Sequence, residues 1–121
     1  MAESIMLEKA KDLAVDVVSA CRKIREQQHE FIITNQLIRC ATSVGAYIHE
    51  SKYGQSPADF LAKMQIALKE CYESEYWLEL LVRTNYLGEK EDKRLRNSCG
   101  AIRRMLVASI NTKKENADGQ R

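Results

Sequence analysis

The chain has 121 residues, of which 45% are hydrophobic and 30% charged, with one proline and five glycines. This length suits a single domain, and the composition is typical of long helices joined by short connections, so a sheet is not expected. No apolar run is long enough to cross a membrane, and the charged N-terminus does not resemble a signal peptide, so we expect a cytoplasmic protein with no membrane partner. The formal net charge of +2 is unevenly spread, because residues 90–121 hold nine basic and four acidic residues.

Four segments carry apolar residues at three- and four-residue spacing, as one face of an α-helix requires. These predicted helices cover residues 4–28, 31–53, 57–83 and 89–111. Ser4 is the expected cap of the first helix, and Gly54 is expected to close the second in a left-handed conformation. Ser56 followed by Pro57 is the clearest start signal, since serine caps helices and proline suits the first helical position.

Short connections force successive long helices to lie antiparallel. The sequence therefore predicts an all-α protein, an antiparallel up-down-up-down four-helix bundle formed by residues 1–112. Residues 113–121 are polar and have no apolar anchor. We expect this tail to be disordered.

The second predicted helix contains a group of small residues, Ala41, Gly45 and Ala46. Glycine inside a helix costs roughly 1 kcal/mol relative to alanine, so some local benefit should offset it. Close packing of a neighbouring helix, from the same chain or another subunit, is the expected benefit.

Residues that could carry chemistry are few. The pair His49-Glu50 begins a zinc-protease motif, but Tyr53 stands where the second histidine is needed, and His29 is the only other histidine. The sequence predicts no catalytic residue, no metal, no cofactor and no small-molecule substrate, with a small hydrolase as the most distant alternative. The four cysteines lie on the apolar faces as expected core thiols, although one metal held by all four is an alternative. They are Cys21, Cys40, Cys71 and Cys99.

Large side chains widen the apolar face of the third helix beyond what a lone bundle needs. Tyr76, Trp77 and Leu81 extend it, and an apolar patch of this kind usually indicates association. We predict that these residues form a homo-oligomer interface. The alternative is that the rings cover one end of the bundle.

Basic residues recur along the fourth helix and into the tail. We expect them on the side opposite the apolar face, where a cationic stripe could bind RNA phosphates. The alternative is an ordinary solvated helix face. The candidates are Lys93, Arg96, Arg103, Arg104, Lys113 and Lys114.

Two motifs together resemble a known family. The first comprises Gln36, Leu37, Arg39, Ala41, Ser43, Val44, Gly45, Ala46, Ile48 and Glu50. The second comprises Ser56, Asp59, Phe60, Lys63, Met64, Ile66, Ala67, Lys69, Glu70, Glu73, Tyr76, Trp77, Leu78, Glu79, Leu80 and Leu81. They are similar to bacterial four-helix-bundle proteins encoded by intervening sequences in 23S ribosomal RNA genes, also called S23 ribosomal protein-like, in the branch that has Lys-Glu where others have Gly-Ser.

The resemblance covers about residues 5–110 and is strongest over 36–87. It departs at Tyr47, where the family usually has asparagine, and at Ser51, where many members have glycine. A role assigned to that asparagine therefore cannot be transferred to this chain.

The resemblance implies a left-handed four-helix bundle that assembles as a ring, most often a homopentamer, with no established catalytic activity. The ribosomal name rests on gene location. A related bundle, the accessory protein of diversity-generating retroelements, is a pentamer that binds nucleic acid and a reverse transcriptase, which supports RNA binding only by analogy. We therefore predict a non-enzymatic cytoplasmic homo-oligomer that binds RNA or a ribonucleoprotein such as a ribosomal particle. The alternative is a protein-binding scaffold or reverse-transcriptase accessory protein with no independent role on ribosomal RNA.

Overall fold

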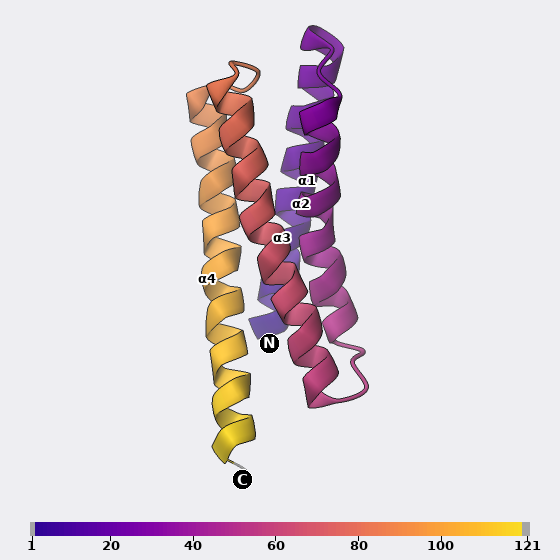
Figure 1. Cartoon of the computed structure of the whole chain (residues 1–121), viewed down its shortest axis with the longest axis vertical. Helices are drawn as coiled ribbons and strands as arrows, with labels where there is room; N and C mark the ends of the chain where they lie inside the picture. The colour runs from indigo at the N-terminus through magenta and orange to yellow at the C-terminus, as the bar shows by residue number, and fades with distance from the viewer. Residues whose placement is uncertain (1, 120–121) are drawn as a thin grey trace.

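The computed structural model describes residues 2–119, with side chains over residues 3–116. It contains four α-helices, α1 Ala2–Gln28, α2 Ile32–Ser51, α3 Pro57–Arg83 and α4 Glu89–Gly119, and no strand within the described part of the chain. Successive helices run in opposite directions and lie around a common axis (Figure 1). Each helix packs against two neighbours: α1 and α3 each contact both α2 and α4. The predicted all-α, antiparallel four-helix bundle is confirmed.

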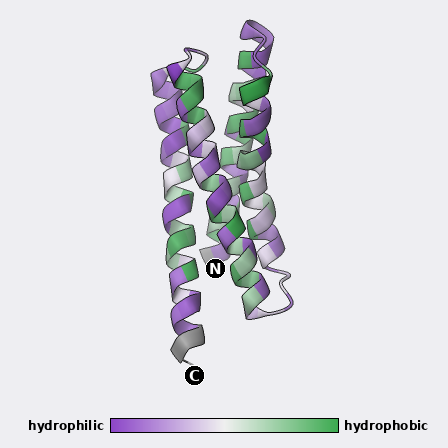
Figure 2. Ribbon diagram, in the orientation of Figure 1, coloured by the Kyte–Doolittle hydropathy of each residue, from purple (hydrophilic) through white to green (hydrophobic). Residues whose placement is uncertain are grey.

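One apolar core runs along the bundle and receives residues from every helix. Leu13, Val44, Leu78 and Leu106 are each fully buried, one from each helix in turn. Figure 2 shows hydrophobic and hydrophilic residues alternating along the helices, as amphipathic helices require. The bundle is therefore held together by burial of the apolar faces that the spacing predicts.

The ends of the helices agree with the sequence in one place and differ in others. Ser56 accepts a hydrogen bond from the Asp59 backbone N–H at 3.1 Å, and Pro57 opens α3 as predicted. The expected Ser4 cap is wrong, because α1 already includes Ala2. Within the described residues no glycine has a positive φ, so Gly54 does not close α2 in a left-handed conformation, and the helix ends at Ser51.

Gly54 instead occupies a crowded position. A Cβ at this position would lie 3.2 Å from the Asp59 carboxylate, the Phe60 backbone nitrogen and the Ser51 backbone oxygen. Two non-glycine residues in the described part of the chain have a left-handed backbone. His29, with φ of 56°, lies immediately after the end of α1, and Asn85, with φ of 65°, lies two residues after the end of α3. A single left-handed residue commonly closes a helix, and both positions use a polar residue that is not glycine.

The small residues of α2 mark a close approach within the chain. A Cβ on Gly45 would lie 3.4 Å from the Ala10 Cβ of α1, and Ala41 is fully buried. Ala46 is exposed and lies outside this contact, so it takes no part in close packing within the bundle, and its packing against another subunit stays a prediction. The reason is that Ala46 is about 100° further around α2 than Gly45.

The tail differs from the prediction. α4 continues to Gly119, so residues 113–119 are helical rather than disordered, while residues 120–121 lie outside the described part of the chain. Extending an existing helix is far easier than starting one, and no proline interrupts this segment. The tail also has an anchor that we did not foresee, because the Lys113 Nζ lies 5.1 Å from the centroid of the Phe60 ring.

None of the helices, over the residues described, is long and apolar enough to span a membrane.

Candidate nucleic-acid and self-association surfaces

The six predicted nucleic-acid-binding residues do not form one stripe. Arg96 pairs with Asp92 at 3.0 Å, and Arg103 pairs with Glu75 of α3 at 3.4 Å. Lys113 lies over Phe60. These three side chains are engaged within the subunit, so the expectation that the basic residues of α4 all face away from the core is wrong.

The helical repeat explains this division. At about 100° per residue, Lys93 and Arg104 lie within about 20° of one line along α4, on its outer side. Arg96 and Arg103 lie about 60° and 80° from Lys93, toward one flank of α4. There Arg103 meets Glu75 of α3, whereas Arg96 pairs with Asp92 of α4 itself. Lys93, Arg104 and Lys114 are exposed and have no ion pair with any residue whose side chain is described. They are the predicted cations of α4 that remain available to a partner, and Lys90, which was not predicted, is likewise exposed and without an ion pair among the described side chains.

Arg94 forms ion pairs that stabilise the fold, and the sequence analysis did not predict them. It pairs with Glu91 at 2.6 Å on its own helix and with Asp16 of α1 at 2.9 Å, so it ties α4 to α1. The hydrogen bond from Arg94 lowers the pKa of Glu91. The i,i+3 spacing of Glu91 and Arg94 signals the local pair, but no sequence signal identifies Asp16 as the second partner.

The predicted self-association residues separate into buried and exposed members. Leu81 is fully buried in the core, so its assignment to an oligomer interface is wrong. Tyr76 is 54% exposed, and its ring lies edge-on to Trp77 with centroids 5.0 Å apart. Trp77 is half-buried and donates a hydrogen bond from Nε1 to the Glu73 carboxylate at 3.0 Å. The exposed apolar surface therefore centres on Tyr76.

Two further apolar residues were missed at this surface of α2 and α3. Ile32, in the first turn of α2, is 81% exposed, and Leu80 on α3 is half-buried. Below them Arg39 of α2 pairs with both Glu70 and Glu73 of α3. α2 and α3 run antiparallel (Figure 1). The Arg39–Glu73 pair sets their register, so Ile32, seven residues before Arg39, and Leu80, seven residues after Glu73, lie toward the same end of the two helices. We call Ile32, Tyr76, Trp77 and Leu80 the upper α2–α3 patch.

The cysteines are buried and chemically quiet. All four are free thiols in the core, and burial raises the pKa of Cys21 and Cys40 to about 11 and that of Cys99 to about 12. The Cys40 sulfur also accepts a hydrogen bond from the Ser74 hydroxyl at 3.2 Å. Over the described residues no group of three or more His, Cys, Asp or Glu side chains could hold a metal ion. Protonated thiols are poor nucleophiles and poor metal ligands, so the arrangement suits packing.

The two histidines are exposed and lie near opposite ends of the bundle, His29 after α1 and His49 near the end of α2. His49 contacts the Tyr53 ring, with centroids 5.4 Å apart. Among the described residues, the thiols of Cys21 and Cys40 form hydrogen bonds with Thr34, Leu37 and Ser74 and with neither histidine. Neither histidine is placed to act as a base for a thiol nucleophile.

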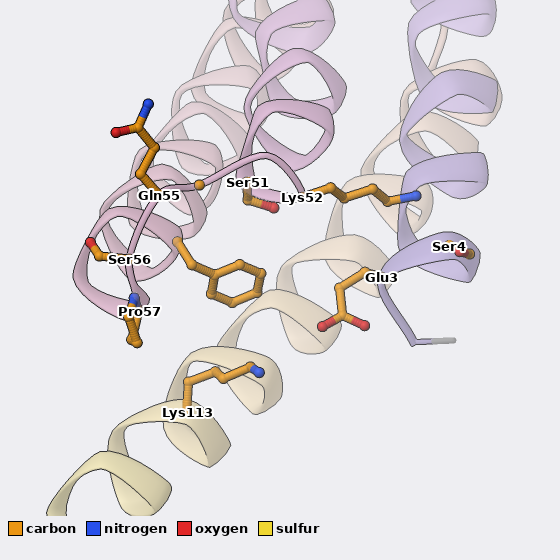
Figure 3. A pocket seen from close by; sticks show the side chains of 10 residues that line it. Glu3, Ser4, Ser51, Lys52, Gln55, Ser56, Pro57 and Lys113 are labelled. Carbon is orange, nitrogen blue, oxygen red and sulfur yellow. The ribbon is translucent and has the colours of Figure 1, made fainter.

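Two open pockets flank the connection between α2 and α3. The larger, about 680 Å³, lies between this connection, the start of α1 and the later part of α4. Figure 3 shows Glu3, Lys52 and Lys113 bordering it from three separate segments. The second, about 590 Å³, is lined by His49, Tyr53 and Lys63 among others. Both are wide, contain charges of both signs and carry no arrangement of groups for a defined reaction.

Comparison with known proteins gives the family. The family model described as 23S rRNA-intervening sequence protein matches residues 2–108. The chain belongs to this family. A solved structure of a protein with unknown function from the S23 ribosomal protein family of Bacteroides thetaiotaomicron is 38% identical, covers 92% of this chain and 99% of that chain, and has a TM-score of 0.90. No curated protein matches the chain.

The matched residues include both motifs of the sequence analysis, and the two departures from the family pattern now have structural descriptions. Tyr47 packs half-buried against the core, with Lys63 Nζ 5.9 Å from its ring centroid. Ser51 is buried and donates to the Ile48 carbonyl at 2.6 Å. In this member of the 23S rRNA-intervening sequence family, both residues therefore serve the packing of α2.

Proposed function

We propose that this protein is a non-enzymatic, cytoplasmic homo-oligomer that binds RNA, alone or within a ribonucleoprotein such as a ribosomal particle, through the exposed cations of α4. The observation that carries the proposal is the placement of Lys93, Arg104 and Lys114, which are exposed and unpaired over the described residues. They belong to residues 90–121, a segment that contains nine basic and four acidic residues. The family's association with ribosomal RNA genes supports the same class of partner.

Binding of this kind is electrostatic, and each subunit of an oligomer would contribute the same cations. Each phosphate neutralised by a lysine or arginine releases counterions, and this release favours binding. The available cations of α4 in one subunit are few. A symmetric ring, which we propose to be a homopentamer, multiplies them and gains affinity through avidity.

The upper α2–α3 patch supports self-association. Ile32 and Tyr76 expose 81% and 54% of their surface, respectively, and burying them against another subunit would remove apolar area from water. Arg39 and Glu73 at the edge of the patch provide charges that can orient a partner.

The absence of a catalytic function is part of the proposal. The thiols are buried with raised pKa values, and both histidines are solvent-exposed near opposite ends of the bundle. This arrangement offers no nucleophile beside a base.

One alternative has an observation in its favour. The upper α2–α3 patch could bind a different protein, which would make the molecule a scaffold or a reverse-transcriptase accessory protein with no independent role on ribosomal RNA. The exposure of Ile32 favours this reading equally well. Salt dependence separates the two, because a protein scaffold need not lose affinity as salt rises.

Fluorescence anisotropy with labelled 23S ribosomal RNA fragments tests the proposal. We expect binding at low salt that weakens steeply toward physiological salt. Reversal of Lys93, Arg104 and Lys114 to glutamate should weaken binding roughly tenfold or more at low salt, since three phosphate contacts become repulsive. Arg96 and Arg103 are left unchanged, because their ion pairs belong to the fold.

The matched control reverses three other cations that are exposed, lie outside α4 and have no ion pair among the described side chains, Arg22, Lys52 and Lys69. It changes the net charge by the same amount. Equal loss in both triple variants would indicate a general charge effect, and no binding by the unaltered protein at low salt would refute RNA binding.

A further inference from the structure

An exposed tyrosine and two arginines meet on the outer side of α3 and α4. Tyr72 on α3 is 53% exposed, and the Arg103 guanidinium carbon lies 5.7 Å from the centroid of its ring. Arg103 is held there by its hydrogen bond to Glu75, one turn along α3. The ring therefore has one guanidinium beside it and retains exposed surface.

Gly100 brings the second arginine into the same cluster. A Cβ at Gly100 would lie 3.2 Å from Nη1 of Arg104 and 3.4 Å from Nη2 of Arg103, so both guanidinium groups lie across this glycine. Gly100 is buried beneath them. Glycine inside a helix is unfavourable, and here its missing side chain makes room for two planar cations beside an aromatic ring.

The charges within this cluster do not cancel. Glu75 neutralises Arg103, whereas Arg104 is exposed and has no ion pair among the side chains described. An aromatic ring with a paired guanidinium over it thus lies near a second arginine that has no ion pair among the described side chains. Tyr76, one turn further along α3, turns toward Trp77 and belongs to the upper α2–α3 patch.

We propose that Tyr72, Arg103 and Arg104 form a stacking site for an unpaired nucleobase of single-stranded RNA. This inference rests on the proposed function and specifies its contact. Aromatic rings and guanidinium planes are the surfaces on which unpaired bases stack, and every base offers a flat face to them. The base stacks on Tyr72, and Arg104 pairs with an adjacent phosphate.

The site selects single-stranded over double-stranded RNA. Bases in a duplex are already stacked on each other, so they cannot reach Tyr72, and a duplex keeps only its phosphate contacts with α4. An acidic peptide could pair with Arg104, but it has no flat aromatic group to occupy the ring. The exposed face of Tyr72 therefore favours RNA over such a peptide.

Anisotropy with a labelled 12-nucleotide adenine-rich strand and with a duplex of the same length tests the inference. We expect Tyr72→Ala to weaken binding of the strand roughly tenfold, as loss of one stacked base does, and to leave duplex binding unchanged. Tyr72→Phe should bind like the unaltered protein, because the ring is retained. The control is Tyr53→Ala, which removes a tyrosine that is 72% exposed at the far end of the bundle. Circular dichroism should show that all variants keep their helicity.

The outcomes separate this inference from the proposed function. If the unaltered protein binds both RNAs but Tyr72→Ala binds the single strand within twofold of it, the stacking site is refuted and the proposed function stands. If Tyr72→Phe loses as much as Tyr72→Ala, stacking is also refuted. If a labelled glutamate peptide of the same length binds as tightly and is lost in Tyr72→Ala, the occupant is an acidic peptide. No RNA binding by the unaltered protein would overturn both proposals.

Discussion

Replacement of Glu30 by alanine should destabilise the bundle more than an ordinary surface substitution. Glu30 lies in the connection before α2 and is only 8% exposed. Its Oε1 accepts the backbone N–H groups of Ile32 at 3.0 Å and Ile33 at 2.8 Å, and its Oε2 accepts that of Thr34 at 2.9 Å. One carboxylate thus satisfies three of the free N–H groups at the start of the helix, where the helix dipole also favours negative charge.

The expected loss in the free energy of unfolding for Glu30→Ala is about 2–3 kcal/mol. Removing an ordinary N-cap costs about 1 kcal/mol, and hydrogen bonds to a charged group contribute about 1.5–3 kcal/mol each but are not additive here. The N–H groups of Ile32 and Ile33 can form hydrogen bonds with water in the variant. Thr34 is fully buried, so its N–H would be left without a partner. Glu30→Gln keeps a neutral acceptor and should lose about half as much.

Urea unfolding followed by circular dichroism at 222 nm, at fixed protein concentration and pH 7, measures these losses. In thermal unfolding a loss of about 2–3 kcal/mol corresponds to a midpoint about 10 °C lower for a domain of this size. A Glu30→Ala variant within about 0.5 kcal/mol of the unaltered protein would show that the three hydrogen bonds contribute little net stability, and the reasoning would fail.

Three other outcomes follow from the geometry. Gly45→Ala should stabilise the protein by up to about 1 kcal/mol in urea unfolding, because its Cβ makes an ordinary 3.4 Å contact, whereas Gly45→Leu should destabilise it; equal effects would argue against close packing. Burial is the main cause that raises the pKa of Glu70 above its usual 4.5, and the nearby charge of Glu73 is a smaller one. The ionised form is therefore disfavoured in the folded state, so stability is lost as the pH rises through the folded pKa. Glu70→Gln should therefore be more stable than the unaltered protein at pH 7 and lose this advantage below about pH 4.5, as unfolding at a series of pH values would show or refute. The four buried thiols should react with Ellman's reagent at pH 8 more than tenfold faster in denaturant than in the native protein, and comparable rates would mean that the core opens readily.

The sequence by itself determined the class of fold and the order of its elements. Apolar spacing is a local property of each helix, so it predicted four amphipathic segments, and the Ser56-Pro57 start was readable because capping involves neighbouring residues. The motifs of α2 and α3 also led to the family that the comparisons give. RNA binding, the subunit number and the absence of catalysis remain predictions.

The tertiary structure decided which way each helix turns and which charges meet across helices. Leu81, which the widened apolar pattern of α3 assigned to an interface, belongs to the core, whereas Leu80, which the pattern did not single out, is half-buried. Arg103 pairs with Glu75 from 28 residues away and Arg94 with Asp16 from 78 residues away, and Lys93, Arg104 and Lys114 are among the cations of α4 that these pairs leave available. A one-dimensional pattern gives the period of each helix but not its rotation relative to its neighbours. That rotation is set by how all four apolar faces pack together, and it determines which polar side chains reach each other and which stay free for a partner.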